Sequence, residues 1–243
     1  MKTLRDFKYV FQMQLFRSSG KLVFIALLQI LMSLGVLCGF TYFFDSPDSK
    51  SILYLATGAP TLILILTGLV ILPQQIGIAK SEGYVEFMRT WPVKRSLILC
   101  ADSVTWLIIT VPGIVVATVV AHSYFAPGYQ LFWTIIPSVL LIALTSIGTG
   151  YGIAYLLPAD ISLAITQVIA FGSLMFSPIN FPMERLPEWL QYLHRILPIY
   201  SMAQVMRASL AASTFTASTG NYIKLIIWCV LGYGWAMFIL NRK

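Results

Sequence analysis

The stretch LVFIALLQILMSLGVLC, residues 22–38, decides the fold class of this chain because it carries no charged side chain. It opens an apolar block at 22–44, and a bilayer core of about 30 Å needs about 20 such residues in helical form. Comparable blocks follow at 52–79, 97–121, 131–157, 161–181 and 222–240. The sequence therefore predicts an all-α integral membrane protein with six transmembrane helices.

The composition agrees with this interpretation and excludes two other classes of protein. Hydrophobic residues make up 58% of the 243 residues and charged residues 10%, whereas soluble domains carry about 25% charged residues. Disordered chains need low hydrophobicity and a high density of charge. The six spans make residues 22–243 one membrane domain, with no room for a second soluble one. We read 22–44 as a retained span, since a signal-peptide core has only about 7–15 apolar residues.

The distribution of basic residues predicts the orientation of the chain in the membrane. With an even number of spans, both termini and the connection between spans two and three lie on one side. That side holds Lys2, Arg5, Lys8, Arg17, Lys21, Lys80, Arg89, Lys94, Arg95, Arg242 and Lys243. The opposite side holds Lys50, Arg185, Arg195, Arg207 and Lys224. The positive-inside rule therefore predicts a multi-pass protein with cytoplasmic N- and C-termini.

Residues 1–21 form an amphipathic pattern before the first span. Apolar side chains recur on one helical face, at Leu4, Phe7, Val10, Phe11 and Leu15. We expect a helix that lies in the cytoplasmic interface, with its cations near anionic lipids; the alternative is a solvated extension of the first span. The net charge of +7 accordingly points to lipid headgroups as partners rather than nucleic acid.

The connection KSEGYVEFMRTWPVKRS, residues 80–96, is the one sizeable polar segment on the cytoplasmic side within the membrane domain. Glu82, Glu86 and Arg89 recur at helical spacing, and Pro92 stops the helix because the residue before a proline is pushed out of the helical region. A short helix here would offer charged and apolar contacts to a cytoplasmic partner. The alternative is a solvated loop with a helical tendency.

The stretch 177–210, after the fifth block, is divided by prolines into pieces too short to cross a bilayer. We expect one short helix with Pro187 near its start and Glu188 in its first turn. We expect a second helix to begin at Ser201, because Gln204 follows at the spacing of a capping box. Irregular backbone at membrane depth must be covered by protein or face water. The sequence therefore predicts a re-entrant helical pair on the external side.

A search for catalytic or ion-coupling groups finds few candidates. His122 and His194 are the only histidines, both on the external side, and no phosphate-binding P-loop or GxSxG motif is present. Ionisable residues near the spans are restricted to Asp102, Asp160 and Lys224, close to span ends, so a proton- or sodium-driven carrier would lack its coupling group. We expect no enzyme activity in this chain and an energy source in another subunit. An integral-membrane enzyme acting on lipid or peptide, and an ATP-independent carrier or channel, remain the alternatives.

Three features resemble the ABC-2-type transporter permeases, the membrane subunits of bacterial ABC exporters. The first is the basic amphipathic helix before six spans. The second is Glu82-Gly83 with Glu86-Phe87-Met88 and the TWPV run at 90–93, which is similar to the cytoplasmic segment before span three of that family. The third is FPMERLPEWL at 181–190, continued by the LP pair at 197–198 and by Arg207, which resembles the external block of that family.

The resemblance implies a working transporter of two permease subunits, as a homodimer or with a sister subunit, and two ATPase subunits that hold ATP and magnesium. A coupling helix at about 81–90 would dock in the ATPase through Glu82, Gly83, Glu86, Phe87 and Met88. In this family the substrate path is lined mainly by spans one, two and five, and its polar candidates here are Thr57, Thr61, Gln74, Gln167, Ser173 and Asn180. The external helices at about 183–212 would include Pro182, Pro187, Trp189, Pro198 and Arg207.

The resemblance also implies a location and a direction of transport. The chain would act in the bacterial plasma membrane as part of an exporter. A path with few charges suits an amphipathic or hydrophobic cargo, such as a drug, a peptide antibiotic, a lipid or a lipid-linked glycan.

Overall fold

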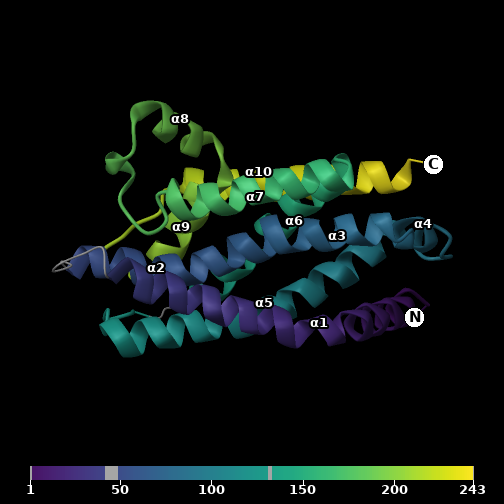
Figure 1. Cartoon of the computed structure of the whole chain (residues 1–243), viewed down its shortest axis with the longest axis horizontal. Coiled ribbons are helices and arrows are strands. Elements are labelled where there is room, and N and C mark those ends of the chain that lie inside the picture. The colour runs from purple at the N-terminus through teal and green to yellow at the C-terminus, as the bar shows by residue number, and fades with distance from the viewer. Residues whose placement is uncertain (1, 42–48, 131–132, 243) are drawn as a thin grey trace.

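The computed structural model describes residues 2–41, 49–130 and 133–242, and its long helices run along one axis (Figure 1). They are α1 (Lys2–Thr41), α2 (Ser49–Leu66), the π-helical turn η1 (Thr67–Ile71), α3 (Leu72–Ser81), α5 (Arg95–Phe125), α6 (Ile135–Leu156), α7 (Ala159–Met175) and α10 (Thr219–Asn241). The shorter elements are α4 (Tyr84–Arg89), η2 (Met183–Arg185), α8 (Glu188–Ile196) and α9 (Pro198–Leu210). The prediction of an all-helical protein is confirmed, because these parts of the chain hold no strand and only an isolated bridge between Gln130 and Ala211.

Four of the six predicted spans correspond to helices that are long and apolar enough to cross a membrane. They are Lys50–Ser81, which joins α2, η1 and α3, and Arg95–Phe125, Ile135–Leu156 and Thr219–Asn241. A fifth candidate is α1, whose halves Thr3–Lys21 and Val23–Gly39 meet at a bend of 61°. The helix α7 has 17 residues and is shorter than the predicted fifth span. Six crossings therefore stay a prediction.

Parts of these sequence predictions lie outside the described residues. They are residue 1 of the predicted amphipathic helix, the expected end of the first span at 42–44, the expected start of the fourth at 131–132, and the terminal Lys243. The helix predicted for 1–21 is present over the first half of α1. Its bend falls where the amphipathic pattern gives way to the apolar block, as expected for a helix that turns from an interface into a span.

The continuous helix α2–η1–α3 is the central element of the bundle. In its most apolar stretch 94% of the residues are buried, against 22% in α10. The turn η1 ends just before Pro73, which has no N–H and whose ring would press on the carbonyl of Leu69 in a regular helix. The helix α6 packs directly against this turn. The two backbones are so close that a Cβ at Gly150 would lie 1.9 Å from the carbonyl oxygen of Gly68. Gly150 therefore serves the packing of α6 against the central helix.

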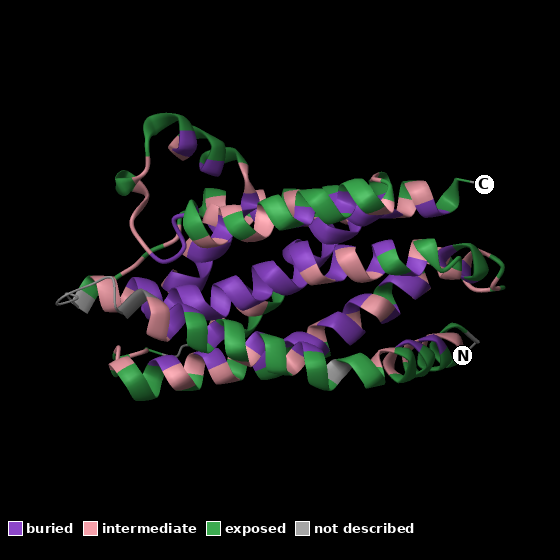
Figure 2. Cartoon of the chain, in the orientation of Figure 1, coloured by how far each residue is buried: buried purple, intermediate pink, exposed green. Residues whose placement is uncertain are grey.

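The two ends of the bundle carry different elements. Both chain termini lie at the same end as α4, as an even number of crossings requires, and α8 and α9 lie at the opposite end (Figure 1). The helix α9 is buried over most of its length, whereas α8 stands away from the bundle and is largely exposed (Figure 2). Two short helices are thus present where they were predicted, but the re-entrant arrangement stays a prediction.

The predicted start of the second short helix at Ser201 is wrong. The helix α9 begins at Pro198, whose fixed φ suits the first helical position and whose missing N–H needs no partner there. Ser201 and Gln204 do not form a capping box. The Ser201 hydroxyl donates to Asn221 Oδ1 at 3.1 Å, and Gln204 Nε2 donates to the Tyr200 hydroxyl at 2.7 Å.

Candidate functional site

The short helix α4 is separated from α3 by a turn at Glu82 and Gly83. Gly83 has φ of +72°, a left-handed conformation that glycine adopts without a Cβ clash. The Gly83 N–H donates to the Lys80 carbonyl at 3.0 Å, at the C-terminal end of α3. The Gly83 carbonyl accepts from the Phe87 N–H at 3.0 Å, which is the first helical hydrogen bond of α4. The helix therefore covers Tyr84–Arg89 and is shorter than the predicted 81–90.

The predicted coupling residues divide between two faces of this segment. Val85 and Met88 are buried against the bundle, so Met88 faces inward. Glu82, Glu86 and Phe87 are exposed, and the Phe87 side chain keeps 58% of its surface accessible. An exposed aromatic ring on a segment that also exposes two carboxylates is a surface suited to bind a partner protein.

Side chains from two long helices hold α4 in place. From α5, Arg95 donates to the Met88 carbonyl at 2.9 Å and to the Arg89 carbonyl, which satisfies the last turn of α4. From α1, the Arg17 guanidinium lies 3.5 Å from the centre of the Tyr84 ring. A displacement of α4 would therefore act directly on α1 and α5 through these two side chains.

The neighbouring end of α3 is attached to α6. The Lys80 ammonium donates to the Ala154 carbonyl at 2.5 Å and to the Leu157 carbonyl at 3.0 Å, at the C-terminal end of α6. These carbonyls have no partner within the helix, and a cation there also complements the helix dipole. Four helices thus meet around the turn that carries α4.

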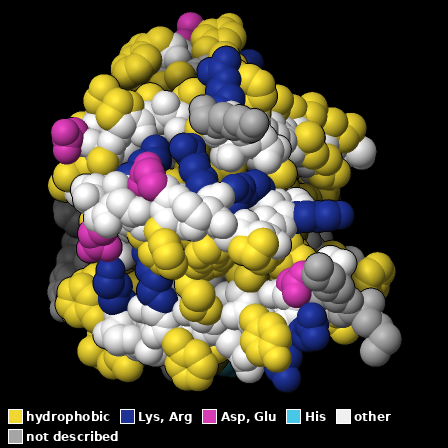
Figure 3. Space-filling model, turned by 90° about the vertical axis from the view of Figure 1, so that its right-hand side faces the viewer, with side chains coloured by type: hydrophobic (Ala, Val, Ile, Leu, Met, Phe, Trp, Pro, Cys, Tyr) yellow, Lys and Arg dark blue, Asp and Glu magenta, His cyan; other side chains and the backbone are white. Residues whose placement is uncertain are grey.

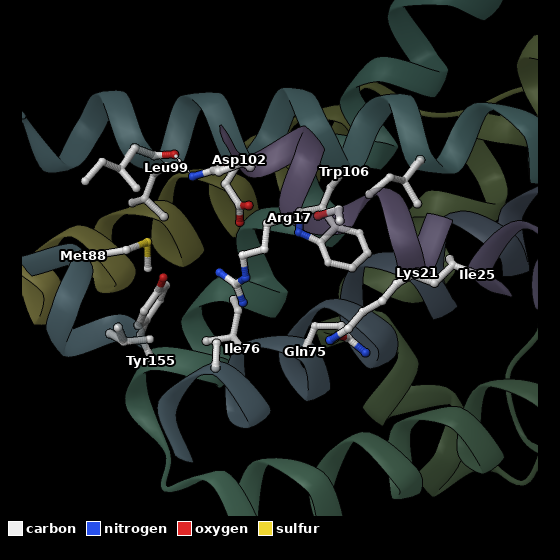
Figure 4. A pocket seen from close by; sticks show the side chains of 16 residues that line it. Arg17, Lys21, Ile25, Gln75, Ile76, Met88, Leu99, Asp102, Trp106 and Tyr155 are labelled. Carbon is white, nitrogen blue, oxygen red and sulfur yellow. Dashed lines mark hydrogen bonds between the residues drawn. The ribbon is translucent and has the colours of Figure 1, made fainter. Parts of the chain in front are cut away.

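Behind α4 lies a cavity of about 70 Å³ that sequence reasoning did not find. Arg17 and Lys21 from α1, Gln75 from α3 and Asp102 from α5 line it (Figure 4). Asp102 accepts a hydrogen bond of 2.5 Å from the Tyr151 hydroxyl on α6. The sequence signal was a single carboxylate inside an apolar block. Its neighbours could not be identified because they come from helices far apart in the chain.

The polar candidates for a substrate path do not form one surface. Thr57 and Thr61 are fully buried in α2, where their hydroxyls donate to the Leu53 carbonyl at 2.7 Å and the Thr57 carbonyl at 2.8 Å. These are the i−4 bonds that helical threonines form when they pack inside a bundle. Their role in a path would require the helices to separate, so it stays a prediction.

The remaining four candidates lie around α7 and the turn that follows it. Gln74 Nε2 donates to the Thr166 hydroxyl at 3.2 Å and so joins α3 to α7, and the adjacent Gln167 is exposed. Ser173 and Asn180 are buried, and their Oγ and Oδ1 atoms have no partner within the described residues. Gln167 is the member of the set that is open to a partner or a substrate in this conformation.

The external residues are organised around Arg207, which is 1% exposed. Its guanidinium donates to the carbonyls of Pro178 and Ile179, both at 2.6 Å, and lies 4.3 Å from the centre of the Tyr54 ring. Burial lowers the pKa of Arg207 to about 10, although the nearby Tyr54 acts in the opposite direction. Arg207 therefore fixes the turn after α7 to α9.

The other predicted external residues differ in exposure. Pro198 is buried, whereas Pro187 and Trp189 are exposed and Pro182 is half-buried. His194 is buried, and its Nε2–H donates to the Phe176 carbonyl at 2.9 Å, so it anchors α8. Within residues 2–41, 49–130 and 133–242, no three His, Cys, Asp or Glu side chains lie close enough to hold a metal ion.

The comparison with known protein families agrees with this architecture. The family described as ABC-2 type transporter matches residues 7–211, from the first turns of α1 to the residue after α9. Among curated proteins no sequence matches the chain. The match spans α4, the central helix and the buried arginine of α9, and with the apolar helices it identifies a multi-pass membrane component of a transporter. The chain belongs to the ABC-2 type transporter family.

Proposed function

We propose that the chain is the permease subunit of an ATP-driven exporter, and that a separate ATPase subunit binds at α4. The observation that carries this proposal is the division of α4 into two faces. Val85 and Met88 attach it to the bundle, while Glu82, Glu86 and Phe87 face outward without covering. A helix attached in this way can be pushed by a partner without first being unfolded.

The two arginine side chains that hold α4 could transmit a displacement of this helix into the membrane domain. ATP and magnesium would be bound by the ATPase subunits, whose closure would displace the outward face of α4. Arg17 and Arg95 would pass this displacement to α1 and α5, and Gly83 would allow α4 to move relative to α3. Such transmission requires contacts that differ between two states, which short, side-chain-mediated tethers can supply.

The charge of the α4 end supports its placement in the cytoplasm. Lys and Arg side chains gather across the middle of this end, with Asp and Glu side chains around them (Figure 3). Under the positive-inside rule both termini would then be cytoplasmic and the α8–α9 end external. The membrane concerned would be the bacterial plasma membrane.

A second permease subunit is proposed to complete the transport path. Large apolar side chains are exposed along α1, α7 and α10, and most of them would face lipid. On α7, the exposed Gln167 beside the 72%-exposed Val168 offers a surface for a second copy or a sister subunit. A path between two such surfaces would suit an amphipathic or hydrophobic cargo, such as a drug, a peptide antibiotic, a lipid or a lipid-linked glycan.

The experiment that tests the docking assignment is a reversal of charge on α4. Glu86→Arg should lower co-purification of the ATPase at least about tenfold, because it places a cation where the partner meets a carboxylate. Glu184→Arg makes the same change at an exposed site at the opposite end and should leave the complex intact. Equal recovery of the ATPase with both variants would contradict docking at α4. Transport by the chain alone in liposomes would contradict the ATP-driven mechanism itself.

A further inference from the structure

The cavity behind α4 is lined by charged groups of both signs. Arg17 and Lys21 are exposed at its open side, whereas Asp102 and Gln14 lie deeper. One water-sized sphere occupies about 10–15 Å³, so a cavity of about 70 Å³ accommodates several non-hydrogen atoms. In Figure 4, Arg17 and Asp102 point into the same space from α1 and α5, and Lys21 lies beside Gln75.

Several polar atoms in this cavity are not fully used by the protein. Gln14 is 4% exposed, and its Oε1 has no partner within the described residues, while its Nε2 donates to the Ile98 carbonyl at 3.4 Å. Lys21 makes one hydrogen bond, to Gln75 Oε1 at 3.0 Å. In the described parts of the chain no ion pair joins Arg17 or Lys21 to a carboxylate; Arg17 stacks on Tyr84 and lies near enough to Asp102 to attract its charge. A buried polar group without a partner costs free energy unless a ligand or water satisfies it.

The depth of the cavity corresponds to the headgroup region of a bilayer. The helix α5 has 31 residues and is therefore about 46 Å long, longer than a hydrocarbon core of about 30 Å. Asp102 is about 10 Å from the start of α5 at a rise of about 1.5 Å per residue, so it lies near the border of the core. Lys21 ends the first half of α1, at the bend before the apolar stretch.

We propose that this cavity binds the headgroup of a phospholipid that carries a phosphate and a primary amine. The phosphate lies between Arg17 and Lys21, because a guanidinium and an ammonium together match its charge and its acceptor oxygens. The ammonium of the headgroup reaches inward to Asp102 and to the free Oε1 of Gln14. The acyl chains extend into the bilayer beside the apolar half of α1.

A bound headgroup would connect the helices on either side of the coupling segment. Val85 and Met88 form part of the cavity wall, and Arg17 reaches from the cavity to the ring of Tyr84 on α4. The headgroup would thus bridge α1 to α5 directly behind α4. If the proposed function holds, this lipid would support the surface on which the ATPase pushes, although the binding itself does not depend on an ATPase.

The test measures which lipid the purified full chain retains. The protein is reconstituted in vesicles of equal parts phosphatidylethanolamine, phosphatidylcholine and phosphatidylglycerol, extracted in mild detergent, and its bound lipids are counted by native mass spectrometry. The wild-type chain should retain phosphatidylethanolamine about tenfold over the other two, because only this headgroup combines a phosphate with a cationic N–H donor for Asp102, whereas phosphatidylglycerol offers neutral hydroxyls and phosphatidylcholine has no N–H.

Two matched pairs of variants separate the roles of the charges. Arg17→Gln should lower retention of all three lipids about tenfold, whereas Arg5→Gln, an exposed change on the same helix, should not. Asp102→Asn should abolish the preference for phosphatidylethanolamine over phosphatidylcholine, and the exposed Asp160→Asn should keep it. If Asp102→Asn fails to fold, Lys21→Gln replaces it, with reduced retention expected for every lipid.

Three results would overturn the proposal. The first is equal retention of the three lipids by the wild-type chain. The second is the same loss in Arg5→Gln as in Arg17→Gln. The third is thermal stabilisation by soluble phosphoethanolamine without retention of phosphatidylethanolamine, which would assign the cavity to a soluble ligand instead of a lipid.

Discussion

The two ends of the bundle hold their short helices by different means. At one end, α4 buries only Val85 and Met88 and depends on Arg17 and Arg95, which reach it from other helices. At the other end, α9 buries nearly every side chain it has and contains its own anchor, Arg207. The first end can shift without exposing a large apolar area, whereas the second cannot. The difference indicates a movable end and a fixed end.

Arginine plays a related chemical role at both ends, which makes the comparison testable. Arg95 and Arg207 each donate to two backbone carbonyls, of Met88 and Arg89 in the first case and of Pro178 and Ile179 in the second. Arg95 is half-buried, while Arg207 is 1% exposed. Loss of a donor costs more where water cannot replace it, so equivalent substitutions should affect folding at one end and motion at the other.

The largest effect is expected at the fixed end. Arg207→Ala would leave the carbonyls of Pro178 and Ile179 without their donor and would open a cavity under Tyr54. We expect a loss of about 3–5 kcal/mol in the free energy of unfolding, seen as a large fall in the thermal unfolding temperature in detergent. Arg185→Ala removes an exposed arginine at the same end and should change stability little. Similar unfolding temperatures for the two variants would mean that this end is not fixed by its buried arginine.

An intermediate effect is expected at the movable end. Arg95→Gln removes the side chain that satisfies the last carbonyls of α4, so the helix should fray at a local cost of about 1–2 kcal/mol. Amide hydrogen exchange over Tyr84–Arg89 should rise about tenfold or more, while global unfolding changes little. Lys94→Gln, at the exposed neighbouring position, is the control. A large drop in global stability with Arg95→Gln would contradict the distinction between the two ends.

The sequence predicted the movable end better than the fixed one, for a physical reason. The helical spacing of Glu82, Glu86 and Arg89 and the stop at Pro92 are local signals, and α4 forms between them. The start of α9 was misplaced at Ser201 because a capping pattern was preferred over Pro198, and the partner of Ser201 is Asn221, twenty residues away. The number of crossings could be proposed from the apolar blocks, but α7 ends at Met175, before a turn that is held by the distant Arg207.

The contents of the candidate site were predicted only in part. Exposure of Glu86 and Phe87 follows from their place in a short polar segment, whereas the inward direction of Met88 depends on how α4 lies on the bundle. The cavity could not be predicted, because Arg17 and Asp102 are brought together only by the contact of α1 with α5. Single-sequence patterns report the periodicity of each helix and not which helices become neighbours.

The smallest effect is expected in α8, which belongs to the fixed end by position but is held by only a few contacts. His194 donates to the Phe176 carbonyl, and Lys224 and Trp228 of α10 donate to the carbonyls of Arg195 and Ile196. Burial lowers the pKa of His194, and its hydrogen bond to the Phe176 carbonyl opposes this only in part. The detached helix has the ordinary pKa of about 6.5, so it gains a proton more readily than the docked one as the pH falls below that value. The free energy that docks α8 is therefore at its full value above about pH 6.5 and falls below that pH. Uptake of one whole proton would lower it by about 1.4 kcal/mol per pH unit, and we expect a fraction of this because protonation is partial.

Hydrogen exchange in Glu188–Ile196, corrected for intrinsic rates, should rise between pH 7.5 and 5.5 in the wild-type chain and in His122→Gln but not in His194→Gln. Persistence of the rise in His194→Gln would show that a group other than His194 makes the docking of α8 depend on pH.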